Sequence, residues 1–319
     1  MSPDTAVRER EVRNLIGVPR IAYFGPSGTF TEMALARFEN LGAFDAPVER
    51  VAAASPPAAL ELLRNGDVDG AVVPIESSVE GSVPPTMDAL SLGTRLQIIA
   101  ETELDIAFTL VTRPGVAAAD VATIGAYPVA AAQVRKWIAD NLPAAEIVTA
   151  SSNAGAAEDV ASGKVDAGVA TALAGERLGL AVLADGVADF AGARTRFVLV
   201  SRPGPIPERT GCDRTSVILQ LPNVPGSLVR AMTELATRGI DLTRIESRPT
   251  RKDYGTYFFH LDWVGHIDDA LVAEALKALH RFAQVRFLGS WPAVSEHGVP
   301  PVSDDDDAQW LKRLRRGEE

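Results

Sequence analysis

The stretch Arg20–Phe38 reads RIAYFGPSGTFTEMALARF and contains the first strand, turn and helix that the sequence predicts. Its first five residues are mostly apolar, as in a buried strand, and Gly25–Gly28 has the composition of a tight turn. Thr29 and Glu32 have the three-residue spacing of a capping box, which predicts a helix through Phe38. A strand followed by a turn and a helix is the repeating unit of α/β proteins.

The same alternation continues to about Arg202. We expect further strands at residues 69–75, 121–126, 146–149, 164–170, 181–183 and 195–200, and helices at 55–66, 128–141, 153–162 and 171–178. Residues 95–112, RLQIIAETELDIAFTLVT, predict two extended strands between two similar halves. We interpret them as a crossover between two lobes, with a second crossover near Asp189. Two lobes with a double hinge enclose a cleft, and such clefts bind small polar ligands.

A Pro- and Gly-rich linker, residues 203–213, precedes a smaller unit. Its pattern predicts strands at 215–221, 240–247, 255–264 and 285–289 and helices at 225–238 and 268–282, the βαββαβ order of a ferredoxin-like fold. The predicted fold class is therefore α/β. A two-lobed, periplasmic-binding-protein-like domain occupies residues 20–202, and a ferredoxin-like domain occupies 214–292. We expect the leader before residue 20 and the tail after Trp291 to be mostly disordered.

Composition narrows the classes of function. The chain of 319 residues has a formal net charge of −11, which argues against a nucleic-acid surface. It has no apolar run of about 18 residues that would span a membrane, and its charged leader is not a secretory signal. With one cysteine it forms no intrachain disulfide, so we expect a cytoplasmic protein. All four histidines lie at or after His260, so chemistry in the first 259 residues uses no histidine base or zinc ligand.

Three segments of the larger region carry candidate site residues. The turn Gly25–Phe30 would present backbone N–H groups to an anion, although an ordinary turn has the same composition. Val73–Val83 puts two carboxylates and three hydroxyls after a buried strand, where α/β proteins bind ligands; serines that cap a turn are the alternative. Arg194–Phe197 places two arginines beside Thr195, either to hold a carboxylate or simply at a strand edge. Gln133 lies on a predicted helix and points either into the cleft or to solvent.

The smaller unit has its own candidate ligand site. Gly226-Ser227-Leu228-Val229 opens a helix, where a glycine lets a ligand approach the backbone, and Glu246-Ser247 lies near the end of a strand. The alternative, which these segments alone favour, is that both have only an ordinary structural role in loops.

Taken together, the segments at about residues 20–292 resemble the prephenate dehydratases in content and order. The resemblance lies in the turn Gly25–Phe30, in Val73–Val83 with Ser77 where the family usually has Asn, and in Thr195-Arg196-Phe197 preceded by Asp189. The segments GSLV (226–229) and LTRIESRP (242–249) are similar to those of the family's C-terminal regulatory domain, the ACT domain.

The resemblance implies conversion of prephenate to phenylpyruvate without a cofactor or metal, inhibition by L-phenylalanine, and a homodimer or homotetramer. It implies Thr195 as the catalytic hydrogen-bond donor. The substrate-binding residues that it implies are Gly25, Ser27, Gly28, Thr29, Glu76, Ser77, Ser78, Gly81, Gln133, Arg196 and Phe197. The implied phenylalanine site consists of Gly226, Ser227, Leu228, Val229, Glu246 and Ser247. An arogenate dehydratase and a non-catalytic, amino-acid-sensing binding protein are the alternatives.

Overall fold

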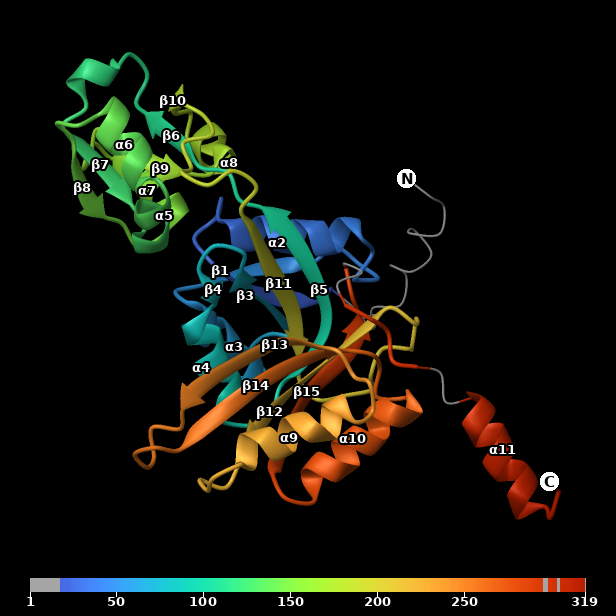
Figure 1. The fold of residues 1–319 in the computed structure, drawn as a ribbon. Coiled ribbons are helices and arrows are strands. Elements are labelled where there is room, and N and C mark those ends of the chain that lie inside the picture. The colour runs from blue at the N-terminus through green and yellow to red at the C-terminus, as the bar shows by residue number, and fades with distance from the viewer. Residues whose placement is uncertain (1–17, 295–297, 303–304, 319) are drawn as a thin grey trace. The chain divides into compact units, whose positions relative to one another are not determined.

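A computed structural model of the protein describes residues 18–294, 298–302 and 305–318 (Figure 1). The expected disorder of the leader therefore falls almost wholly outside the described residues. The described chain forms two compact units. One contains residues 18–86 and 102–199, and the other contains 87–101 and the chain from residue 200 onward.

The first lobe begins as the sequence predicts, with a strand, a turn and a helix. Ser55 caps its second helix by accepting the N–H of Ala58, and Gly66, with φ +82°, ends that helix. The parallel strands β1, β2 and β3 lie in a sheet of order β2-β1-β3-β11-β5, and β4 pairs with β3. Its elements are β1 (Arg20–Phe24), α2 (Phe30–Asn40), β2 (Glu49–Ala53), α3 (Pro56–Asn65), β3 (Gly70–Ser77), β4 (Gly81–Ser82), α4 (Pro84–Ser91), β5 (Gln97–Asp105) and β11 (Arg194–Ser201). We did not predict β2, β4 or α4.

The second lobe is a separate five-stranded sheet of order β10-β6-β9-β7-β8. The chain enters it between β5 and β6 and leaves it between β10 and β11, which confirms the predicted double crossover. Its elements are β6 (Thr109–Thr112), the 3₁₀ helix η1 (Ala118–Asp120), β7 (Thr123–Ala126), α5 (Pro128–Gln133), α6 (Arg135–Asn141), β8 (Glu146–Thr149), α7 (Asn153–Ala161), β9 (Ala167–Ala170), α8 (Ala172–Arg177) and β10 (Ala181–Ala184).

The single helix that we predicted at residues 128–141 is wrong in one respect, because it is divided at Val134. There the backbone leaves the helical region, with φ −120° and ψ 6°. The carboxylate of Asp189 accepts the N–H groups of Lys136 and Trp137, both at 2.9 Å. This distant side chain satisfies the first N–H groups of α6, so the interruption is stabilised from outside the helix.

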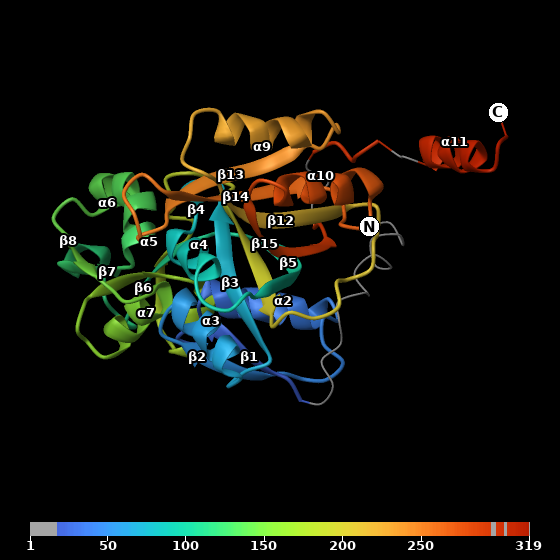
Figure 2. The same cartoon turned by 90° about the horizontal axis from the view of Figure 1, so that it is seen from below.

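The predicted ferredoxin-like βαββαβ order is confirmed in the C-terminal part. A four-stranded antiparallel sheet of order β13-β14-β12-β15 carries α9 and α10 on one face (Figures 1 and 2). Between the sheet and helices lies a core that includes Val217, Leu235, Trp263 and Leu279. Its elements are β12 (Asp213–Gln220), α9 (Ser227–Ala236), β13 (Leu242–Pro249), β14 (Tyr257–Val264), α10 (Ala270–His280) and β15 (Gln284–Pro292).

The tail departs from the expectation of disorder, because residues Asp305–Arg315 form the helix α11. Nearly all of its described side chains are exposed, so packing contributes little to it. Asp306 and Asp307 lie in its first turn and Lys312, Arg313 and Arg315 in its last. Charges in these positions complement the helix dipole, which favours a helix even without burial.

Candidate active site and effector pocket

The turn between β1 and α2 is held by hydrogen bonds within the protein. The N–H of Gly25 donates to the last carbonyl of β2 (2.9 Å), and the N–H of Gly28 donates to the carboxylate of Glu32 (2.7 Å). The buried hydroxyl of Thr29 donates to the last carbonyl of β1 and accepts the N–H of Glu32. Half of the capping box is therefore confirmed, whereas the Glu32 carboxylate reaches Gly28 instead of Thr29. Two N–H groups that we expected to hold an anion thus already have partners.

The polar segment after β3 is joined to the strand that carries Thr195. Ser77 Oγ accepts the N–H groups of Val79 (3.2 Å) and Glu80 (3.3 Å) and so closes the turn. The N–H of Ser78 donates to the carbonyl of Arg194 (2.8 Å), and the N–H of Arg194 donates to Ser78 Oγ (2.9 Å). Gly81 lies opposite Ser77 in the pairing of β3 with β4. Two motifs more than 110 residues apart therefore form one surface.

At the start of β11, Arg196 is buried and its guanidinium lies 2.9 Å from the carboxylate of Glu76. This pairing brings together two predicted substrate residues and pre-orients the guanidinium. Thr195, between Arg194 and Arg196, is half-buried. Phe197 is only 2% exposed and belongs to the core, so the structure gives it a packing role.

Gln133 is the predicted residue that links the two lobes. It is the last residue of α5 in the second lobe and is buried, and its Nε2 donates to the carboxylate of Glu80 in the first lobe over 3.4 Å. The backbone carbonyl of Gln133 accepts the N–H of Asp189 (2.7 Å). Asp189, which belongs to the family pattern, therefore lies beside Gln133.

Glu32 and Arg177 were not predicted as site residues, and Glu80 was considered only as part of a motif. Arg177, at the end of α8, contacts Ser27 and Glu32 in the turn between β1 and α2. No signal within α8 indicated this contact, because it joins residues about 150 positions apart. Glu32 had one signal, its place in the capping box.

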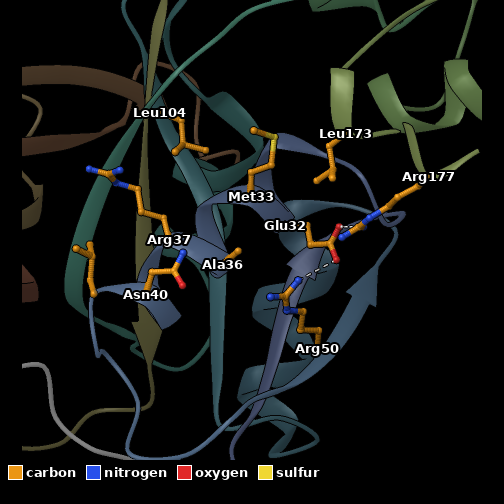
Figure 3. Close-up of a pocket in the computed structure, with 10 residues that line it drawn as sticks. Glu32, Met33, Ala36, Arg37, Asn40, Arg50, Leu104, Leu173 and Arg177 are labelled. Atoms are coloured by element: carbon orange, nitrogen blue, oxygen red, sulfur yellow. Dashed lines mark hydrogen bonds and ion pairs between the residues drawn. The ribbon is translucent and has the colours of Figure 1, made fainter. Parts of the chain in front are cut away.

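Beside these contacts, a cavity of about 290 Å³ lies along α2 (Figure 3). Its lining combines apolar side chains with arginines and includes Met33, Arg37, Arg50, Leu104, Leu173 and Arg177. Within the residues that the structure describes, no three His, Cys, Asp or Glu side chains are grouped to hold a metal ion.

In the C-terminal sheet, a second cavity of about 230 Å³ opens at the start of α9. Gly226, Ser227, Leu228 and Val229 line it, together with residues of β14 that include Tyr257 and Phe259. Gly226 has φ +82° and precedes the first helical residue, so the first N–H groups of α9 lie at the cavity.

The two remaining predicted effector residues lie on opposite faces of β13. Ser247 pairs with Phe259, and register partners point to the same face of a sheet, so Ser247 lies on the cavity side. Glu246 pairs with His260 and points to the other face. Within one chain, Glu246 therefore does not close this cavity as we expected.

That other face carries a polar layer formed with residues 87–101. Arg244 makes a two-point ion pair with Asp262 (2.7 and 2.8 Å), and Arg248 makes one with Asp88 (2.9 and 3.2 Å). His260 is fully buried, with its Nε2 2.8 Å from Ser91 Oγ. Burial, together with the charge of Arg244, lowers the pKa of His260 to about 3.

The fold and these sites define a class: a two-lobed α/β protein with polar residues gathered between β3, β11 and α5, and a C-terminal ACT-type domain. The comparisons with known proteins agree. The prephenate dehydratase family matches residues 21–205, and the ACT domain family matches residues 215–281. The prephenate dehydratase of Mycolicibacterium vanbaalenii is 60% identical over 310 residues, which cover 94% of this chain and 99% of the relative.

Among solved structures, prephenate dehydratase from Arthrobacter aurescens in complex with L-Phe superposes with a TM-score of 0.84. It is 39% identical, and the match covers 93% of this chain and 99% of the other. GqqA, described as a novel type of quorum-quenching acylase, gives a TM-score of 0.73 at 30% identity over 86% of this chain and 98% of its own. The chain belongs to the prephenate dehydratase family and carries a C-terminal ACT domain.

Proposed function

We propose that the protein converts prephenate to phenylpyruvate, as a hydro-lyase of L-phenylalanine biosynthesis that phenylalanine inhibits. The observation that carries the proposal is the family match across residues 21–205, joined with the contacts that bring its motifs together. In the reaction, the bond to the ring carboxylate breaks and its electron pair enters the ring as the bond to the ring hydroxyl breaks. Carbon dioxide and, after protonation, water leave, and the ring becomes aromatic.

The protein must orient the substrate, bind its two carboxylates and assist the departing hydroxyl. In this proposal Thr195 donates a hydrogen bond to that hydroxyl. Arg196, held by Glu76, binds a carboxylate, and Ser77, Ser78 and Gln133 position the ring and its hydroxyl. The steps that we assign to these residues require neither a metal nor a cofactor.

The decisive assay incubates the purified protein with prephenate and follows phenylpyruvate by its absorbance in base. Arogenate is assayed in parallel, because an arogenate dehydratase would prefer the substrate with the additional amino group. Binding of prephenate without turnover would instead favour an amino-acid-sensing binding protein. No product from either substrate at saturating concentration would contradict the proposed activity.

For regulation, we propose that phenylalanine binds in the cavity at the start of α9. Support comes from the L-Phe complex of the Arthrobacter aurescens relative and from the N–H groups at this helix end, which suit a carboxylate. Val229 (69% exposed) and Tyr257 (45%) line the cavity, and Ile245 (47%) is a further exposed apolar side chain of this domain; such side chains suit burial against a second ACT domain. A homodimer or homotetramer would provide it, and Glu246 would contribute only from a partner copy.

Two further proposals concern organisation and location. We assign residues 20–202 to catalysis and 214–292 to regulation, although residues 87–101 pack in the same unit as the regulatory part. We also propose a cytoplasmic location, in keeping with a biosynthetic role. In the described part of the chain, no helix is long and apolar enough to cross a membrane.

A further inference from the structure

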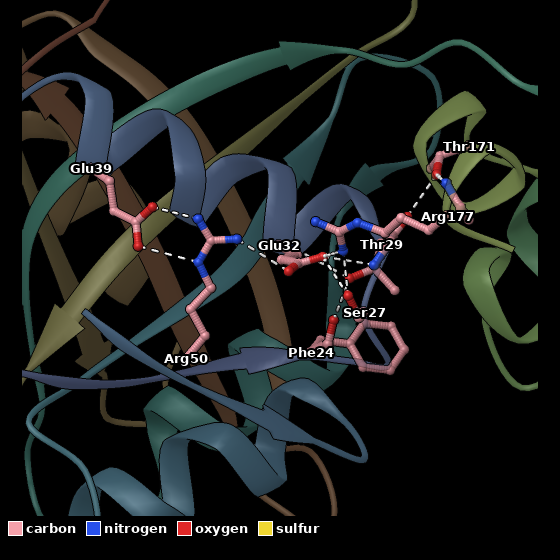
Figure 4. A network of polar contacts seen from close by, with 10 residues as sticks. Phe24, Ser27, Thr29, Glu32, Glu39, Arg50, Thr171 and Arg177 are labelled. Carbon is pink, nitrogen blue, oxygen red and sulfur yellow. Dashed lines mark hydrogen bonds and ion pairs between the residues drawn. The ribbon is translucent and has the colours of Figure 1, made fainter. Parts of the chain in front are cut away.

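Both ends of helix α8, in the second lobe, contact the turn between β1 and α2 in the first lobe (Figure 4). At the start of α8, the hydroxyl of Thr171 donates to the carbonyl of Gly28 (2.6 Å) while it accepts the N–H of Ala174 (3.0 Å). At the end of α8, the guanidinium of Arg177 contacts Ser27 Oγ and lies 2.5 Å from the carboxylate of Glu32. The two lobes are thus tied at Gly25–Thr29, the turn from which substrate contacts are expected.

Glu32 is the centre of this tie. Its side chain is only 7% exposed, and its carboxylate meets Arg177 from the second lobe and Arg50 from the first, the latter at 3.1 Å. The same carboxylate accepts the N–H of Gly28 (2.7 Å) and the hydroxyl of Ser27 (3.1 Å). Burial alone would raise the pKa of Glu32, but the Gly28 N–H and Arg177 outweigh it and lower that pKa below its usual value. The carboxylate therefore stays charged at neutral pH and keeps both arginines.

Gly28 packs so closely against α8 that the turn cannot shift relative to this helix. Gly28 has φ +92°, and a Cβ built on it would lie 2.9 Å from the Cβ of Ala174. Its N–H is taken by Glu32 and its carbonyl by Thr171. A change in the angle between the lobes must therefore break the Thr171–Gly28 hydrogen bond and the packing of Gly28 against Ala174.

We propose that Glu32 and Arg177 are positioning residues for the reaction, which hold the lobes closed so that the Gly25–Thr29 turn and Gln133 meet the same substrate. This inference rests on the proposed function. Neither side chain is assigned contact with the reacting atoms. They act on how often the empty protein adopts the closed, binding-competent arrangement. When that fraction falls, apparent affinity falls in proportion, while substrate at saturation restores closure.

The test compares two variants that each remove one arginine from Glu32. Arg177→Met breaks the tie between lobes, whereas Arg50→Met removes a partner that belongs to the first lobe, on β2. We expect Arg177→Met to raise the KM for prephenate about fivefold or more with kcat within about twofold, because only the closed fraction changes. Arg177→Lys should recover part of the loss, and Arg50→Met should leave the KM within about twofold of wild type.

A second measurement does not depend on turnover. Spin labels on Asn65→Cys in α3 and Asp140→Cys in α6, both exposed positions, with Cys212→Ser, report the distance between the lobes. We expect a broader or longer distance distribution in Arg177→Met than in Arg50→Met. If both variants keep the wild-type KM and distances, the pair is only structural and the inference is overturned. If the wild type fails to turn over prephenate, the proposed function fails, and the distances still decide whether Arg177 holds the two lobes together.

Discussion

Thr195 stands between two arginines whose surroundings differ sharply. The side chain of Arg194 is 59% exposed and pairs with Asp105, whereas that of Arg196 is 5% exposed and pairs with Glu76. The sequence presented the two arginines as equivalent, because spacing alone does not say which one a strand turns inward. Burial distinguishes them, since a buried guanidinium depends on each hydrogen bond far more than an exposed one.

For Thr195, we expect Thr195→Ala to lower kcat by about 10²–10⁴-fold, the usual contribution of a positioned proton or hydrogen-bond donor. Thr195→Ser keeps the hydroxyl and should retain much more activity. Steady-state kinetics with prephenate provide the measurement, and the melting temperature checks that the fold persists. An alanine variant with more than about a third of wild-type kcat would show that the hydroxyl has no such role.

For Arg196, we expect Arg196→Lys to raise the KM with a smaller change in kcat. Lysine keeps the charge but loses the planar fork that holds both Glu76 and a substrate carboxylate. The loss of one hydrogen bond to a charged group, about 1.5–3 kcal/mol, corresponds to roughly a 10- to 150-fold change. Arg194→Lys is the matched control on the same strand and should change the KM little. Equal KM values for both variants would assign Arg196 to structure alone.

Among the secondary-structure elements, α9 offers the sharpest test of regulation, because each of its ends has a glycine with positive φ. Gly226 has φ +82° at the cavity and Gly239 has φ +63° beyond the other end, and neither has atoms within 4 Å of a built Cβ. We expect Gly226→Val to abolish inhibition by phenylalanine while basal kcat stays nearly intact. The added side chain would occupy the ligand's approach to the helix N-terminus.

The control is Gly239→Val, which imposes a similar backbone strain far from the cavity. Inhibition curves for wild type and both variants provide the comparison. Coupling between effector and active sites is typically about 1–3 kcal/mol, so a shift in sensitivity of tenfold is easily measured. Unchanged inhibition in Gly226→Val would move the phenylalanine site elsewhere.

The buried His260 of β14 lies against Ser91 of α4. Its burial predicts that the stability of the fold depends on pH. The folded pKa is about 3, against an ordinary value of 6.5, because burial and Arg244 oppose the charge, although Asp262 and Asp88 favour it. Between these values the unfolded chain binds a proton and the folded chain does not. The free energy of unfolding should therefore fall as pH is lowered from about 6.5 towards 3.

The measurement is urea denaturation of wild type and His260→Gln at several pH values in this range. The difference between the two proteins isolates the histidine from the titration of carboxylates. The wild type should lose stability faster than the variant as the pH falls. Parallel curves would mean that folding does not lower the pKa of His260 and would contradict this expectation.

The element predictions failed where distant residues decide local structure. The division of the predicted helix at Val134 depends on Asp189, more than 50 positions away. No residue within 128–141 indicated this division. The face on which Glu246 lies depends on an irregularity in the β13–β14 pairing between Leu242 and Arg244. Helix α4 begins with two prolines and was too short to give a periodic signal.

For the whole molecule, alternation of apolar and helical patterns was sufficient to predict both lobes, the double crossover and the βαββαβ order, because burial enforces each pattern locally. The motifs also predicted which residues form the candidate site. Its interior contacts, such as Arg196 with Glu76 and Arg177 with Glu32, join segments far apart in the chain. Such pairings are properties of the tertiary fold, and a single sequence does not contain them.

At the same scale we expect activity to survive removal of metal ions. The first 211 residues contain no histidine or cysteine, so the region to which catalysis is assigned lacks the usual ligands for transition metals. Exhaustive dialysis against a strong chelator should leave kcat and KM for prephenate unchanged. A loss that returns on adding a divalent ion would contradict this expectation.

The packing of residues 87–101 with the C-terminal sheet bears on how this protein can be recombined with its relatives. A Cβ at Gly289 would lie 2.3 Å from the carbonyl oxygen of Ile98, and Glu101 is buried against Arg214. The buried side chains of Met87, Leu90, Leu96 and Ile98 belong to the same unit. A chimera joined at the linker, residues 203–213, would combine the regulatory sheet of a relative with residues 87–101 of this protein. Those residues are shaped to pack against this protein's own sheet. The compact unit that contains the C-terminal sheet is therefore discontinuous, and it includes residues 87–101 together with the chain from residue 200 onward.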